Sequence, residues 1–428
     1  MPPLSRNIAT GSVCAIVQIS ANFLAYPIYL HFLGYHDLGV WLTLASVLNL
    51  VQFISAGISP AVTQFVARAD SRREFDDVRH TLAWSVAAIL LFGLALIAAA
   101  KIAAPLLPRL DPAIARAAAS LAPGLILAAT LALAVEFAAA INAGLGSIQR
   151  AYVAIAAGQF LALIIGAALL WRGFGIPALL IGYTAARVSS LLLLAPNLPA
   201  PRRLHPDPRV LSALFQSSAV MLSGSVLNIF VAPLNRWIIA ASAGVSAVPV
   251  FDIAYTGSLQ VRNVLEFGLR SLLPEAAALD PSQPEAIHKL HSVWLQRTVL
   301  AGIALYGAVA IAAPLALSLW LGNRLLPEQA FLFRLFLIAS FLNLCGTPAY
   351  YILAGLKRIS AVFYSYVIQA FVSAVIVAVA VIAAPSAALI ASGLAAAIAM
   401  LGSTSFLISR IPRHRLAASP LARQWTQG

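Results

Sequence analysis

The sequence is poor in charged residues, in acids and in cysteine. Of its 428 residues only 10% are charged, whereas a soluble domain carries about 25%. Its two cysteines, Cys14 and Cys345, lie far apart in apolar runs, so we expect neither a disulfide nor a thiolate metal site. Histidine is sparse, and neither an HExxH pattern nor a G-x-x-x-x-G-K-[ST] loop occurs. These absences argue against a soluble domain, a zinc hydrolase and an ATPase.

The sequence has instead long apolar runs, since 61% of its residues are hydrophobic. A helix needs roughly 20 apolar residues to cross a bilayer. We therefore predict an all-α, polytopic membrane protein with twelve transmembrane helices. The first run is too long for a signal peptide. The predicted spans are residues 8–32, 39–66, 80–100, 117–142, 152–171, 176–195, 213–240, 249–273, 293–317, 331–354, 361–383 and 387–408.

The predicted spans divide into two halves around a Pro- and Arg-rich linker. The linker, NLPAPRRLHPDPRV, follows six spans and precedes six more, and the tripeptide at residues 11–13 recurs at 224–226. Six spans in each half give both halves the same orientation, as in transporters built from parallel repeats. We predict two pseudo-symmetric six-helix lobes. The predicted segments are the first lobe, 1–196, the cytoplasmic linker, 197–210, the second lobe, 211–410, and a basic cytoplasmic tail, 411–428.

The basic residues predict the orientation. The chain has 27 Lys and Arg against 14 Asp and Glu, an excess that would suggest nucleic acid in a soluble protein. Here the Lys and Arg outside the spans lie about three to one on the side of the N-terminus, which is typical of the cytoplasmic side. We predict cytoplasmic termini in a bacterial inner membrane, a tail that contacts anionic membrane lipids, and no nucleic-acid partner.

Four stretches resemble a known family in their order and spacing. They are FLGYHDLGVWLTLASVLNLVQFISAGISPAVTQFVARA at 32–69, GLGSIQRAY at 144–152, SLWLG at 318–322 and ILAGLKRIS at 352–360. They are similar to the lipid-linked oligosaccharide flippases, the O-antigen and exopolysaccharide branch of the multidrug/oligosaccharidyl-lipid/polysaccharide exporter superfamily. The chain departs from the family pattern at Ala56 and at Asn235-Arg236, where members often carry an aspartate.

The resemblance implies a flippase with a MATE-like fold. It would move a polyprenyl-pyrophosphate-linked oligosaccharide by alternating access, for surface polysaccharides such as lipopolysaccharide or exopolysaccharide, coupled to a proton or a sodium gradient. The polymerase and glycosyltransferases of the pathway would be its partners. The short loops leave no room for a catalytic domain, so we expect no enzyme and no cofactor. Two alternatives stay open: a multidrug or cation antiporter of the same superfamily, and a non-transporting scaffold of a polysaccharide synthase.

The eighth predicted span carries a charged stripe. Arg262, Glu266 and Arg270 are spaced at i, i+4 and i+8, on one helix face. One interpretation is an internal ladder in which Glu266 bridges both arginines. The other is a basic stripe facing a cavity, where guanidinium groups bind the pyrophosphate. We take Arg262 as the best candidate, because one carboxylate leaves the stripe with a net positive charge.

Other ionisable residues also fall inside predicted spans. Arg236 has two interpretations: an anchor at the membrane interface beside Trp237, or a contact to phosphate or sugar. Arg187 also has two: it faces the cavity, or it packs within the helix bundle. Glu136 pairs with Arg187, carries a proton, or packs as a neutral acid. Asp252 lies near the outer interface. With Glu266, we assign Glu136 and Asp252 to ion coupling or charge pairing.

Amide side chains occur in several predicted spans. They join helices by hydrogen bonds or contact the sugars of the substrate. The candidates for a polar cavity lining are Gln18, Asn22, Asn49 and Asn235.

Overall fold

The computed structural model describes residues 4–72, 74–105, 111–198, 207–212, 214, 227, 233–269, 272–277, 279 and 283–412. Every regular element among them is helical, so the predicted all-α class is confirmed. The α-helices are α1 Leu4–Arg72, α2 Phe75–Ala103, α3 Pro112–Gly144, α4 Ile148–Trp171, α5 Ile176–Leu194, α7 Pro233–Ser242, α8 Ala247–Leu269, α9 Leu272–Ala277, α10 Pro284–Leu321, α11 Gln329–Gly355, α12 Ile359–Ala383 and α13 Ala388–Ser409.

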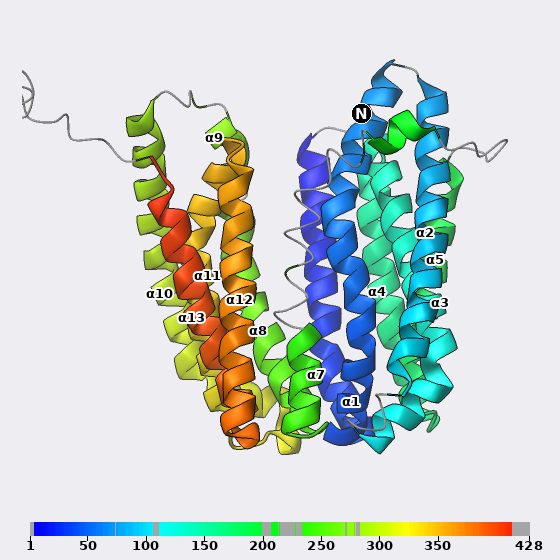
Figure 1. Ribbon diagram of the computed structural model, residues 1–428, viewed down its shortest axis with the longest axis vertical. Coiled ribbons are helices and arrows are strands. Elements are labelled where there is room, and N and C mark those ends of the chain that lie inside the picture. Colours follow the sequence, from blue (N-terminus) through cyan, green and yellow to red (C-terminus); the bar gives the residue numbers. More distant parts are fainter. Residues whose placement is uncertain are drawn as a thin grey trace, which may run out of the picture. The chain divides into compact units, whose positions relative to one another are not determined.

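Among the described residues, nine helices are long and apolar enough to cross a membrane. The first of them contains a bend. Helix α1 runs continuously through the predicted spans 8–32 and 39–66, but Gly34 has φ 69° and ψ −176°. Only glycine adopts such angles readily, and the chain doubles back there, so that α1 forms two legs (Figure 1).

Two other predicted spans do not appear among these nine helices. Helix α8 covers most of the span predicted at 249–273, and its mean hydropathy is lowered by the charged and amide side chains noted above. Helix α7 covers the end of the span predicted at 213–240, whereas residues 213, 215–226 and 228–232 lie outside the described part of the chain. The polytopic architecture is thus confirmed, and the total of twelve spans stays a prediction.

The chain forms two compact units. Unit 1 comprises Met1–Ile253, Leu317–Pro327 and Ala378–Leu389, and unit 2 comprises Ala254–Ala316, Glu328–Val377 and Ile390–Gly428. Helices α8, α10, α12 and α13 each begin in one unit and end in the other. The predicted lobes at 1–196 and 211–410 stay a prediction.

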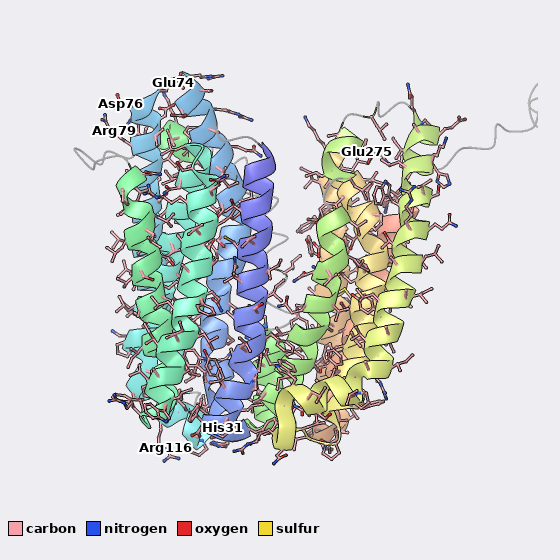
Figure 2. The ribbon with its side chains drawn as sticks, turned by 180° about the vertical axis from the view of Figure 1, so that it is seen from behind. His31, Glu74, Asp76, Arg79, Arg116 and Glu275 are labelled. Atoms are coloured by element: carbon pink, nitrogen blue, oxygen red, sulfur yellow. The ribbon has the colours of Figure 1, made fainter. Side chains whose placement is uncertain are left out.

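In unit 1, α3 packs closely against α1. A Cβ atom on Gly144 of α3 would lie 2.7 Å from Cβ of Val66 and 2.9 Å from the carbonyl oxygen of Thr63, so only glycine permits this approach. Asp111 caps α3 by accepting a hydrogen bond from the Ala113 amide. Figure 2 shows Arg79 at one end of unit 1 and Arg116 at the other.

Unit 2 is held by apolar side chains and by hydroxyl groups. Ile287 of α10 and Leu353 of α11 are fully buried in one cluster. The Ser340 hydroxyl of α11 donates to the Ser258 carbonyl of α8 at 2.9 Å and also pairs with the Tyr306 hydroxyl of α10. These bonds hold α8 against α11, where the charged stripe lies.

Candidate functional site

Arg262 of α8 lies between two acceptors in unit 2. Its Nη1 donates a 2.6 Å hydrogen bond to Oδ1 of Asn343 on α11. Its Nη2 lies 2.7 Å from Oε2 of Glu266, one turn further along α8, at the i, i+4 spacing that the sequence predicts. The guanidinium is therefore held from two helices.

Both partners of Arg262 are held in turn. The Tyr351 hydroxyl donates to Oε1 of Glu266 at 3.1 Å, and the Asn343 amide contacts Sδ of Met400 on α13 at 2.9 Å. We call Arg262, Glu266, Asn343 and Tyr351 the Arg262 network. Because its members come from α8 and α11, the guanidinium cannot turn freely, and it is oriented before any ligand arrives.

The Arg262 network is not closed. The Arg262 side chain is 25% exposed, and its Nε–H is buried without a hydrogen-bond partner among the described residues. Nη1 has a second N–H beyond the one donated to Asn343, and Oε2 of Glu266 also makes no hydrogen bond among the described residues, so the contact with Nη2 is an ion pair only. The guanidinium therefore keeps donors for an additional acceptor. Arg270, the third member of the predicted stripe, lies outside the described residues.

Unit 1 contains a second arginine–carboxylate pair, which is more deeply buried than the pair of Arg262 and Glu266. Nε and Nη2 of Arg236 on α7 both donate to Oδ1 of Asp252 on α8, the first at 2.7 Å. The Tyr26 hydroxyl of α1 donates to Oδ2 of the same carboxylate. The Arg236 and Asp252 side chains are 10% and 1% exposed. Asp252, which we expected at the interface, is thus buried as the partner of Arg236.

Glu136 of α3 lies at an open cavity of about 460 Å³ in the surface of unit 1, whose lining includes the exposed residues Pro60 and Gln64. The cavity is lined by Ser55, Ser59, Pro60, Thr63, Gln64 and Glu136, and we call it the Glu136 cavity. Ser55 is hydrogen-bonded to the Glu136 carboxyl group, and the charge of Arg187 on α5 acts on it. Arg187 makes no ion pair within 4.0 Å of Glu136; it lies 4.5 Å from the centre of the Tyr183 ring.

The predicted amides are distributed over unit 1. Asn22 accepts a 2.8 Å hydrogen bond from Gln159, which joins α1 to α4. Asn235 is buried on α7, and Gln18 and Asn49 are half-buried on the two legs of α1. The Asn22 contact is of the helix-joining kind, and the sequence does not reveal its partner.

The helices thus define a multi-pass membrane protein, and comparison with solved structures identifies the fold. A multidrug resistance MATE family transporter of the MOP superfamily, in its inward-facing conformation, matches 97% of this chain and 100% of its own with a TM-score of 0.76 and 16% identity. The lipid II flippase MurJ, in an inward closed conformation, matches 93% of this chain and 87% of its own, with a TM-score of 0.69 and 13% identity.

A third structure has the same fold. A MOP superfamily transporter from Pyrococcus furiosus matches 95% of each chain, with a TM-score of 0.57 and 15% identity. The fold is therefore the MATE-like fold. No curated protein matches the sequence. The chain belongs to the polysaccharide biosynthesis protein family, whose model matches residues 31–327.

Proposed function

We propose that the protein moves a polyprenyl-pyrophosphate-linked oligosaccharide across the bacterial inner membrane for surface polysaccharide biosynthesis, by alternating access. The family supports the pathway, and the fold supports transport. The predicted parallel lobes at 1–196 and 211–410 are the repeats that would rock against each other.

The observation that carries this proposal is the oriented guanidinium of Arg262. A pyrophosphate headgroup is an anion that must pass an apolar barrier, and charged groups inside a membrane usually face a ligand path or a partner. Arg262 has a partner in Glu266 but keeps free N–H groups, as a ligand-binding guanidinium requires. The Glu266 carboxylate balances the positive charge while the site is empty.

The test is mass spectrometry of lipid intermediates from a strain that lacks the gene. We expect polyprenyl-pyrophosphate oligosaccharide to accumulate on the cytoplasmic side, and its mass would identify the sugars. Restoring the gene should clear the intermediate. Unchanged intermediates together with lost tolerance to cationic drugs would overturn the proposal in favour of a multidrug antiporter. Unchanged intermediates and unchanged tolerance, with loss of polymer, would instead favour a scaffold.

We further propose that both termini lie in the cytoplasm. The N-terminal leg of α1 begins at the end of unit 1 where Figure 2 places Glu74, Asp76 and Arg79, opposite His31 and Arg116. A reporter active only outside the cytoplasm, fused after Arg116, should be active, and the same reporter fused after Arg79 should be silent. The reverse result would invert the proposed orientation.

A further inference from the structure

The Glu136 cavity is separate from the Arg262 network, since none of its lining residues belongs to that network. It lies wholly within unit 1, and its lining combines a carboxylate with the side-chain oxygens of Ser55, Ser59, Thr63 and Gln64. Hydroxyl groups are common between membrane helices, but a carboxylate there is expensive and usually faces the protein interior or a water-filled cavity. A volume of about 460 Å³ also admits several water molecules.

The shape of the cavity follows from the sequence of α1. Ser55, Ser59 and Thr63 are spaced at i, i+4 and i+8, so they form one stripe on the second leg of α1. Pro60, the residue after Ser59, lacks the N–H that would bond to the carbonyl four residues earlier, which leaves that helix turn open. Ser55 is buried and bonds to Glu136, while Thr63 donates to the Ala140 carbonyl at 3.2 Å. The stripe thus leads along α1 to the carboxylate.

Of the helices packed around Glu136, α5 provides the charged side chain that acts on its carboxyl group. Helix α1 faces it with hydroxyl and amide groups, and α5 faces it with Arg187, whose Nε–H is buried without a partner among the described residues. The charged residues of α2 and α4 lie near the ends of those helices: Asp76, Asp77, Arg79, His80, Lys101 and Arg150. Arg187 is close enough to act on the carboxylate but is not ion-paired with it.

We propose that Glu136 is a proton-binding site that is loaded through the Glu136 cavity. A hydronium ion in the cavity gives its proton to a carboxylate oxygen and leaves water, and the neutral acid remains bonded to Ser55. On release of the proton to water, the carboxylate attracts the Arg187 guanidinium. Proton occupancy would thereby change the attraction between α3 and α5. This deepens the proposed function and rests on it, because proton flow would drive transport.

The test reads the proton directly, on the purified full-length protein in lipid nanodiscs. Infrared difference spectra between acid and alkaline buffer should contain a protonated-carboxyl band that Glu136→Gln removes. Glu266→Gln, a matched change of a carboxylate on α8, should retain the band. Ser55→Ala, which keeps the carboxyl group but removes its hydrogen bond, should move the band to higher frequency. A band that persists unchanged in Glu136→Gln overturns the proposal.

Two more outcomes separate the proposal from its alternatives. If sodium chloride, but not choline chloride, alters the band of the wild-type protein at constant pH, the site binds a metal cation and the proton assignment is wrong. Folding of Glu136→Gln is checked by its thermal unfolding midpoint, and Ser55→Ala supplies an independent reading if that variant does not fold. If the strain that lacks the gene accumulates no lipid intermediate, the transport proposal is refuted, while the Glu136 band still decides the proton site.

Discussion

The two arginine–carboxylate pairs differ in how completely they are enclosed. In unit 1, Arg236 and Asp252 are nearly inaccessible, and the Tyr26 hydroxyl donates to the second carboxylate oxygen. In unit 2, the side chains of Arg262 and Glu266 are 25% and 15% exposed, and the Arg262 Nε–H has no acceptor among the described residues. The enclosed Arg236–Asp252 pair therefore joins helices, whereas the partly exposed Arg262–Glu266 pair still offers hydrogen-bond donors.

The pairs also differ in how the chain brings them together. Arg262 and Glu266 are one helical turn apart, so one helix suffices. Arg236 and Asp252 are on different helices, and they meet because the chain turns at Gly244, which has φ 90°. With Tyr26 they join α1, α7 and α8. We infer that Arg236 braces unit 1, whereas Arg262 keeps the donors that the proposed substrate contact requires.

The largest effect is expected from breaking the buried pair. Asp252→Ala leaves an uncompensated buried guanidinium, which should lower the free energy of unfolding by about 3–5 kcal/mol. The measurement is denaturant-induced unfolding in bicelles. The double variant Arg236→Met with Asp252→Leu replaces both charges by apolar groups and should recover most of the loss. A double variant as unstable as Asp252→Ala would show that the pair is not the cause.

Arg262→Ala should have its largest effect on transport. Loss of charge-assisted hydrogen bonds of about 1.5–3 kcal/mol would lower export of the lipid-linked oligosaccharide roughly 10- to 150-fold. The measurement is the amount of surface polymer and of accumulated intermediate, at matched protein levels. Arg297→Ala is the matched control, because Arg297 lies exposed on α10 and packs on Trp294. Normal export by Arg262→Ala would remove Arg262 from the substrate path.

These pairs show what a sequence reveals about such a site. The i, i+4 spacing predicts the contact of Arg262 with Glu266, because helix geometry alone brings them together. The same reasoning cannot predict the contact of Arg236 with Asp252. Helix spacing relates only residues about one turn apart, whereas these two residues lie on different helices and are brought together by tertiary structure. For the same reason Asn343 is recognisable as an amide within an apolar span but not as a partner of Arg262, and Tyr351 gives no signal at all.

The fold is more predictable than the site. Long apolar runs locate helices such as α2, predicted at 80–100 and observed at Phe75–Ala103. The ends differ because charged residues extend the helix beyond the apolar part, as with Asp76 and Lys101. The cavity beside Glu136 is not predictable, since it requires the second leg of α1 to lie against α3, and Gly144 decides that approach.

A smaller effect is expected from Tyr26→Phe, which keeps the aromatic ring and removes the hydroxyl bonded to Asp252. A hydrogen bond to a charged group contributes about 1.5–3 kcal/mol, so the loss should be smaller than for Asp252→Ala. Tyr29→Phe on the same helix is the control, since no hydrogen bond of its hydroxyl is found among the described residues. Equal losses in the two variants would mean that the Tyr26 hydroxyl does not support the pair.

The smallest change in stability is expected from Glu266→Gln. A partly exposed i, i+4 ion pair contributes about 0.3–0.5 kcal/mol, and glutamine can still accept the Tyr351 hydroxyl, so the free energy of unfolding should fall by no more than about 0.5 kcal/mol. The same change frees a donor on Arg262 and removes a negative charge beside it. Binding of a short polyprenyl pyrophosphate to the purified variant should therefore tighten, as measured by microscale thermophoresis. A loss of stability comparable to that of Asp252→Ala would mean that Glu266 stabilises unit 2 as Asp252 stabilises unit 1. The two pairs would then not differ in function.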